Sequence, residues 1–127
     1  MRPSKPTLTG QELEIMKVIW KLDTATVRQV YETMLKRRRI AYTTVMTMMN
    51  ILEQKGYLKK EQSDRAYVYQ PAQPQQQVIR SMVREFLDRV FNGSAEPLLA
   101  HLVEDRRLTE NDLEEIRKTI KSARRQR

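Results

Sequence analysis

Small hydroxyl and amide side chains are concentrated between positions 41 and 55 of this 127-residue chain. If the segment is a helix with about 100° per residue, one of its faces carries Thr43, Thr44, Thr47, Asn50, Ile51 and Gln54. Hydroxyl and amide groups can hydrogen-bond base edges in the major groove of DNA, and threonine can contact the thymine methyl group. An acid would repel phosphates, and Glu53 lies only at the flank of this face. We therefore predict that four side chains contact bases: Thr43, Thr44, Thr47 and Asn50.

The opposite side of the same segment is apolar, as an amphipathic helix requires. The alternative for its polar side is an ordinary solvent-exposed surface. Exposed helical faces usually mix Glu and Lys, whereas threonine is a mediocre helix former, so a run of exposed threonines favours a binding role. The side chains that we expect in the core are Ala41, Val45, Met48, Met49 and Leu52.

Basic and aromatic side chains flank this segment in the sequence. The formal net charge is +8, of which +6 lies in residues 1–73, and this points to a polyanionic partner, nucleic acid before an anionic membrane. The alternatives are a helix-dipole complement for the arginines at 37–39 and solvated surface charge for the rest. The candidate phosphate-binding residues are Arg37, Arg38, Arg39, Tyr42, Lys59, Lys60, Arg65 and Tyr67.

Caps and periodicity predict the elements that position these side chains. Thr9 with Glu12 and Thr26 with Gln29 form two capping-box patterns, each followed by apolar residues at helical spacing. A third helix, the one described above, ends at Gly56, a residue type favoured just after a helix. Each of the three helices is therefore amphipathic.

Two short segments rich in Tyr, Val and Lys follow, at 57–61 and 65–70, and they predict a β-hairpin that turns at 62–64. Three helices and a hairpin in this order define a winged helix-turn-helix, which we assign to residues 7–71. The predicted fold class is mostly α with a small β-hairpin, followed by a C-terminal helical dimerisation domain.

Pro71 and Pro74 mark a boundary, and we assign residues 74–127 to the second domain. It contains three amphipathic helices, the second following Pro97, and a basic tail from Lys121 that we expect to fray. So short a domain forms little core alone, so we predict that it buries its apolar side chains in a two-fold homodimer. The alternative is packing against the winged helix of the same chain. The predicted dimerisation residues are Ile79, Met82, Val83, Phe86, Leu87, Val90, Leu98, Leu99, Leu102, Leu113, Ile116 and Ile120.

The sequence gives no support for catalysis. It contains no cysteine and one histidine, His101, and it has neither a Ser-His-Asp set nor a phosphate-cradling glycine loop. We therefore expect no enzymatic activity, no cofactor and no metal site. No apolar run approaches the roughly 18–20 residues of a membrane span, and residues 1–7 do not resemble a signal peptide, so we expect a cytoplasmic chain without membrane insertion.

Several of these segments together resemble the penicillinase-repressor family, BlaI/MecI, over about residues 7–122. The resemblance implies a dimeric repressor that binds a palindromic operator in double-stranded DNA, controls β-lactamase or related antibiotic-resistance genes, and is relieved through a membrane sensor-protease. By matching position, it also places the three threonines in the base-reading helix. The matching residues are Leu8-Thr9-Gly10, Glu12, Val18-Ile19-Trp20, Ala41-Tyr42-Thr43-Thr44-Val45-Met46-Thr47, Leu52-Glu53, Lys55-Gly56-Tyr57-Leu58, Arg65-Ala66-Tyr67 and Tyr69-Gln70-Pro71.

Three features depart from the family's pattern. Ile51 stands where many members have arginine, so a different operator sequence or affinity is expected. Some members are inactivated by cleavage of an Asn–Phe bond, and the matching stretch here, Leu99-Ala100-His101-Leu102, lacks that pair. The copper-responsive members use cysteine ligands, which this chain does not have.

The sequence thus predicts a steric transcriptional repressor. An alternative of another class is a winged-helix protein-interaction module whose basic face docks an acidic partner. RNA binding is a third interpretation, disfavoured because the hairpin has no aromatic stacking motif.

Overall fold

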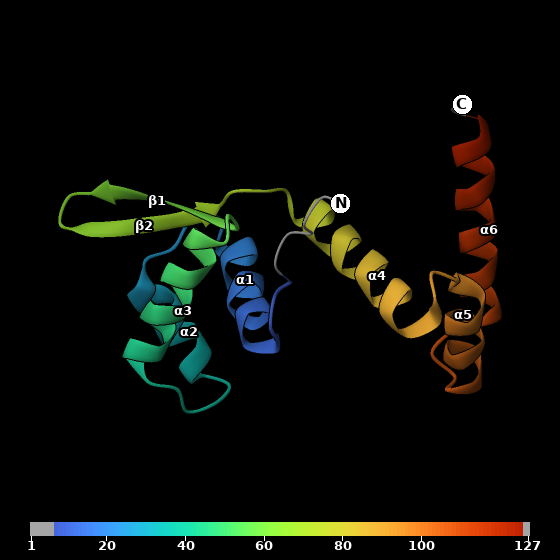
Figure 1. Ribbon diagram of the computed structural model, residues 1–127, viewed down its shortest axis with the longest axis horizontal. Helices are drawn as coiled ribbons and strands as arrows, with labels where there is room; N and C mark the ends of the chain where they lie inside the picture. The colour runs from blue at the N-terminus through green and yellow to red at the C-terminus, as the bar shows by residue number, and fades with distance from the viewer. Residues whose placement is uncertain (1–6, 126–127) are drawn as a thin grey trace. The chain divides into compact units, whose positions relative to one another are not determined.

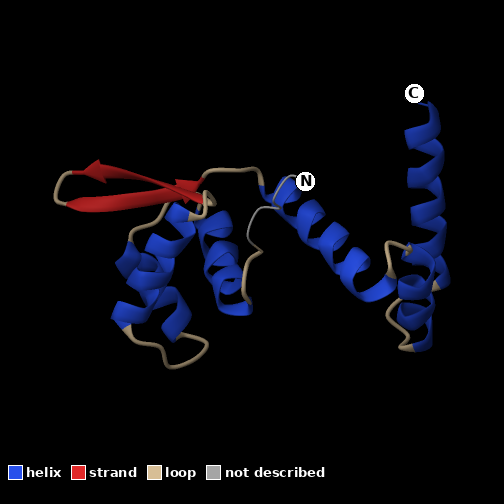
Figure 2. Cartoon of the chain, in the orientation of Figure 1, coloured by secondary structure: helices blue, strands red, loops and turns tan. Residues whose placement is uncertain are grey.

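The computed structural model describes residues 7–125, which form six helices and a two-stranded antiparallel sheet (Figure 1). They belong to two compact units, Met1–Arg80 and Ser81–Arg127. The predicted order of three helices, a hairpin and further helices is confirmed (Figure 2). The elements are α1 (Gly10–Leu22), α2 (Val27–Leu35), α3 (Tyr42–Gln54), β1 (Leu58–Ser63), β2 (Ala66–Pro71), α4 (Gln75–Phe91), α5 (Ala95–Glu104) and α6 (Glu110–Arg125).

Capping boxes begin the first two helices, as predicted. The Thr9 hydroxyl accepts a hydrogen bond from the Glu12 N–H at 3.2 Å, and the Glu12 carboxylate accepts one from the Thr9 N–H at 2.8 Å. Thr26 and Gln29 make the same two bonds at the start of α2, at 3.1 and 2.8 Å. Gly56 follows α3 with φ of 87°, a left-handed conformation that glycine adopts without a Cβ clash.

The hairpin pairs β1 with β2 from Leu58 opposite Pro71 to Ser63 opposite Ala66. Asp64 and Arg65 form its two-residue turn, with Asp64 at φ of 55°. The turn was predicted at 62–64, but in the structure Gln62 and Ser63 belong to β1, and Arg65 lies in the turn and not in the second strand. The reason is that aspartate tolerates a left-handed conformation better than most residues and allows a tight turn at its position.

Ala25, between α1 and α2, forms a strand-like bridge to β2 that the sequence did not predict. Its N–H donates to the Tyr69 carbonyl at 2.9 Å, and its carbonyl accepts from the Tyr69 N–H at 2.8 Å. Ala25 is buried. A bridge of one residue has no alternating pattern in the sequence, so the strand signal is absent there.

The core of the first unit is built by α1, α2, α3 and the hairpin. Val45, Met49 and Leu52 of α3 are fully buried, as predicted. Ala41 was expected in the core but is exposed, because it is the N-cap residue and lies outside the helix proper. Met48 is only half-buried. The largest fully buried side chains are Ile15, Met16, Ile19, Val30, Met34, Val45, Met49, Leu52 and Leu58.

The segment after the hairpin is hydrogen-bonded to the first unit. The Ala72 N–H donates to the Tyr57 carbonyl at 2.9 Å, and the Gln73 Nε2 donates to the Gly56 carbonyl at 3.1 Å. Val78, in the first turns of α4, is also buried. These contacts show why the first compact unit continues past Pro71 and into α4.

Trp20, the single tryptophan of the chain, lies in α1 and is half-buried. Its Nε1 atom is buried and has no hydrogen-bond acceptor among residues 7–125. The indole lines a cavity of about 380 Å³ together with residues 70–75. It therefore reports on the packing of the first unit.

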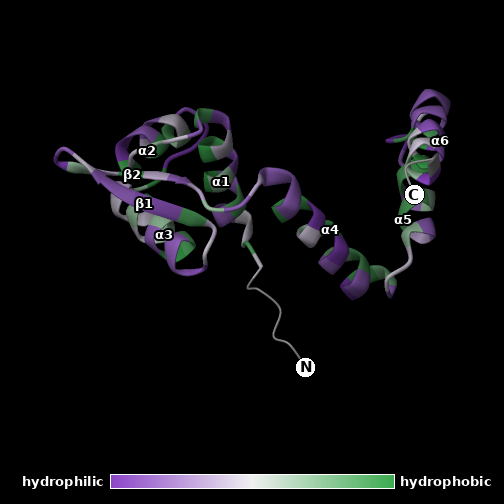
Figure 3. Ribbon diagram, turned by 90° about the horizontal axis from the view of Figure 1, so that it is seen from above, coloured by the Kyte–Doolittle hydropathy of each residue, from purple (hydrophilic) through white to green (hydrophobic). Residues whose placement is uncertain are grey.

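The second unit consists of most of α4 followed by α5 and α6, with apolar and polar stretches alternating along the helices (Figure 3). α4 ends at Phe91, before Asn92 and Gly93 with φ of 53° and 84°. α5 begins at Ala95, earlier than predicted, because a proline fits the first turn of a helix, where an N–H has no helical partner. Across residues 7–125, no helix has both the length and the apolar character needed to cross a membrane.

A capping pair also begins α6. The Thr109 N–H donates to Asp112 Oδ2 at 3.0 Å, and the Asp112 N–H donates to Thr109 Oγ1 at 3.1 Å. The helix continues to Arg125, so the part of the basic tail up to that residue has helical geometry. Residues 126–127 lie outside the described residues.

Candidate nucleic-acid interface

The threonine face of α3 points away from the core. Thr43, Thr44 and Thr47 are exposed, whereas Val45 and Met49 on the opposite side of the helix have no exposed surface. No side chain of the described residues caps the start of α3. Its first N–H groups are therefore open to an anion or to a base edge next to the threonine hydroxyls.

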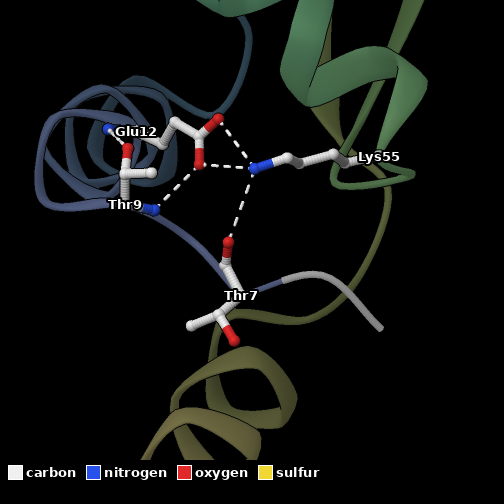
Figure 4. Close-up of polar contacts among 4 residues, drawn as sticks. All are labelled: Thr7, Thr9, Glu12 and Lys55. Carbon is white, nitrogen blue, oxygen red and sulfur yellow. Dashed lines mark hydrogen bonds and ion pairs between the residues drawn. The ribbon is translucent and has the colours of Figure 1, made fainter. Parts of the chain in front are cut away.

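A partly buried ion pair fixes the other end of α3 to the start of α1 (Figure 4). Lys55 Nζ lies 2.9 Å from both carboxylate oxygens of Glu12 and 3.4 Å from the Thr7 carbonyl oxygen. Burial by itself raises the pKa of Glu12, but the Thr9 N–H and the Lys55 ammonium outweigh it and hold that pKa below its usual value. The carboxylate therefore stays charged near neutral pH and anchors the helix that carries the threonines.

Tyr69 ties the hairpin to α3. Its hydroxyl donates to Asn50 Oδ1 at 2.9 Å, while its backbone pairs with Ala25. Burial, with a contribution from the Glu53 charge, raises the pKa of Tyr69, so the hydroxyl remains a donor. A bidentate contact of Asn50 with adenine would use the same carbonyl oxygen. In the structure this oxygen holds the hairpin through Tyr69, so the base contact predicted for Asn50 would have to share or replace that hydrogen bond.

A groove of about 570 Å³ opens beside the threonine face, between the start of α2, α3 and the hairpin. It brings together four of the predicted phosphate-binding residues, one from α3 and three from the hairpin. No acid is among the residues that line it. The four are Tyr42, Lys60, Arg65 and Tyr67.

Arg28, which was not predicted from the sequence, also lines this groove. Its guanidinium carbon lies 5.4 Å from the centre of the Tyr42 ring, and Tyr42 packs edge-on against Tyr31 with ring centres 5.3 Å apart. Arg28 occupies the first turn of α2, where a positive charge is unfavourable for the helix dipole. That misplaced charge was the signal available in the sequence.

Lys59 does not join the groove. Successive side chains of a strand point to opposite faces, and Lys60 stands opposite the buried Tyr69 in the pairing of the strands. Lys59, its exposed neighbour, therefore lies on the other face of the hairpin. The phosphate-binding role predicted for Lys59 has no support from its position.

The three arginines between α2 and α3 have different environments. Arg38 is half-buried and paired with Glu14 of α1, at 3.1 Å from Nη2 to Oε1 and 3.4 Å from Nε to Oε2. Arg37 and Arg39 are exposed. The position of Arg38 favours a structural role, in which it holds the turn before α3 against α1.

The side chains predicted to form a dimer contact are poorly covered in the single chain. Ile79, Met82, Leu87, Leu98 and Leu102 are half-buried. The others are exposed by 37–50%: Val83, Phe86, Val90, Leu99, Leu113, Ile116 and Ile120.

A polar helix face over a packed core, with a basic groove and a hairpin beside it, defines a DNA-binding winged helix-turn-helix. The comparisons with known proteins agree. A family model described as "Penicillinase repressor" matches residues 8–122. The penicillinase repressor of Bacillus licheniformis is 29% identical over 111 residues, 87% of either chain. The transcriptional regulator BlaI of Mycobacterium tuberculosis is 34% identical over 95 residues, covering 73% of this chain and 69% of that one.

A solved structure is also similar: the monomeric form of Bacillus licheniformis BlaI in complex with the blaP half-operator. The TM-score is 0.50 at 32% identity, covering 57% of this chain and 88% of that one. The chain belongs to the penicillinase repressor family. It is therefore a transcriptional repressor and not an enzyme.

Proposed function

We propose that this chain represses transcription as a two-fold dimer that binds a palindromic operator. Each subunit inserts α3 into a major groove, and the dimer places two half-sites about one helical turn apart. Thr43, Thr44 and Thr47 contact base edges, with Asn50 contributing from the end of α3 that the hairpin holds. The observation that carries this proposal is the exposed, acid-free threonine face on a helix whose back is fully buried.

The support for a dimer comes from the second unit. No residue of α5 is buried, and Leu113, Ile116 and Ile120 of α6 are 42%, 37% and 50% exposed. Large apolar side chains left in water disfavour an isolated unit, and burial against an identical copy removes them from solvent. A two-fold dimer also matches the symmetry of a palindrome.

The experiment that tests base reading is selection of binding sites by the full-length chain from a random pool of duplexes. We expect an enriched motif with two inverted half-sites. Thr44→Ala should relax the selected motif, because a hydroxyl and a methyl group at the base edge are lost. Thr119→Ala, in α6, is the matched control and should leave the motif unchanged.

An equal loss of affinity for the selected site and for random duplex in Thr44→Ala would contradict base reading. Failure of the wild-type chain to enrich any motif would contradict the proposed function as a whole. In that case the protein-interaction module becomes the better interpretation.

The family resemblance supports two finer proposals, that the regulated genes encode β-lactamase or related resistance functions and that a membrane sensor-protease relieves repression. The stretch Leu99-Ala100-His101-Leu102 lies within α5 and has no Asn–Phe bond. We therefore expect relief without cleavage at this stretch. Mass spectrometry of the chain recovered from β-lactam-treated cells checks it, and a fragment ending between 99 and 102 would contradict the expectation.

A further inference from the structure

The groove between α2, α3 and the hairpin carries an inference about which part of DNA it contacts. We propose that it binds one phosphodiester of the DNA backbone, with Arg28 and Lys60 as its cationic ligands. This inference rests on the proposed function, because it needs α3 to lie in the adjacent major groove. Arg28 is new here, because it is not among the phosphate-binding residues predicted from the sequence.

Aromatic rings hold both cations in place. Lys60 Nζ lies 4.8 Å from the centre of the Tyr67 ring, and Arg28 lies over Tyr42. The edge-on contact with Tyr31 holds Tyr42 in turn. A cation that is already positioned loses less side-chain entropy when it binds an anion, so the groove is prepared for its ligand.

The first turn of α2 adds to the attraction for an anion. It contains no acid, and the positive end of the helix dipole lies there. Arg28 has an ion pair with Glu32 at 3.8 Å, but both side chains are more than 60% exposed. Such a solvent-screened pair is weak, so it leaves the guanidinium available to a phosphate.

The position of the groove favours a backbone phosphate over a free anion. Met46 and Asn50 of α3 line it, one helical turn from Thr43 and Thr47 respectively. A DNA strand borders each major groove and runs directly beside a protein helix inserted into that groove. The phosphates of this DNA strand therefore come within reach of residues that flank the helix. The groove is therefore continuous with the threonine face.

The test compares four full-length variants on random-sequence duplex DNA over a range of salt concentrations. Arg28→Gln and Lys60→Gln remove the two proposed ligands. Lys17→Gln, at an exposed position of α1, and Lys59→Gln, on the other hairpin face, are matched controls that remove the same charge. Random duplex is sufficient because a phosphate contact is independent of sequence. Circular dichroism melting confirms that each variant is folded.

We expect Arg28→Gln and Lys60→Gln each to weaken binding by about tenfold, as for loss of a hydrogen bond to a charged group. Each should also lower the slope of log affinity against log salt by about 0.9. Lys17→Gln and Lys59→Gln should leave the slope unchanged. An Arg28→Gln slope equal to that of Lys17→Gln would overturn the inference while leaving the proposed function intact.

A second arm separates the two sources of phosphate. Inorganic pyrophosphate is added at constant ionic strength to the wild-type chain and to Arg28→Gln. We expect no displacement of DNA beyond that of the matched ionic strength. Displacement that Arg28→Gln abolishes, with an unchanged salt slope, would show that the groove takes a free anion and would overturn the backbone assignment. Absence of duplex binding by the wild-type chain would overturn both proposals.

Discussion

The two units of this chain differ in how far their large apolar side chains are buried. In the first, Ile19 and Leu52 have no exposed surface. In the second, Ile120 is 50% exposed, and every residue of α6 whose side chain the structure describes is exposed. The contrast teaches that the DNA-binding unit carries its own core, whereas the other unit leaves its large apolar side chains exposed in the single chain, as the proposed dimer requires.

The largest expected effect is a difference in stability loss when one apolar side chain is truncated in each unit. Leu52→Ala should lower the free energy of unfolding by about 2–5 kcal/mol, because it leaves a cavity in a closed core. Ile120→Ala, at a half-exposed site, should change the free energy of unfolding little in dilute solution. It should lower that free energy only at concentrations where copies of the chain associate. Urea unfolding at two protein concentrations measures both. Equal losses at both sites, independent of concentration, would contradict the comparison.

A charge placed on the uncovered side chains should break the association of copies. Ile116→Asp should convert a dimer into a monomer, because a carboxylate would be buried without a partner. Operator affinity should fall by roughly 100-fold or more, since two half-sites are no longer bound together. Analytical ultracentrifugation and operator binding measure the two effects. Asn111→Asp, which adds the same charge at an exposed position of α6, is the control and should remain dimeric.

The ion pair between α1 and α3 should make the first unit sensitive to acid. The pKa of Glu12 is held below its usual value of 4.5, so its carboxylate contributes stability that is fully present above about pH 4.5. That contribution is lost as the pH falls through the lower pKa of the folded state. Glu12→Gln should cost about 1–3 kcal/mol at pH 7 and flatten this dependence. Thermal melts from pH 3 to about pH 7 test it, and an unchanged acid limb would refute the assignment.

The smallest expected effect concerns the link between hairpin and α3. Tyr69→Phe removes the hydrogen bond to Asn50 and should lower the free energy of unfolding by about 0.5–1.5 kcal/mol. Tyr67→Phe, on the same face of the hairpin, loses only an exposed hydroxyl and is the control. Denaturant midpoints for the two variants measure the difference, and matching values would contradict a stabilising role for this hydrogen bond.

Much of the fold follows from local signals that act within a few residues. The capping pairs at Thr9, Thr26 and Thr109 set three helix starts, and Gly56 set an end. The outward direction of the threonine face followed from helical periodicity, because the apolar back of α3 must be buried. These features depend on sequence neighbours and could be predicted.

The parts that could not be predicted depend on contacts between distant residues. The pairing of Ala25 with Tyr69, the Arg38–Glu14 ion pair and the groove that gathers Arg28 with Lys60 all join positions far apart in the chain. Periodicity identifies which side of an element is buried, but it does not say which side chain of another element will meet it.

The single tryptophan allows unfolding of the first unit to be measured separately. Trp20 lies in α1, and no other indole exists in the chain. Its fluorescence therefore monitors melting of the DNA-binding unit alone, whereas circular dichroism at about 222 nm sums over the six helices of residues 7–125. Non-coincident transitions of the two signals would reveal how far the halves unfold independently, without any added label.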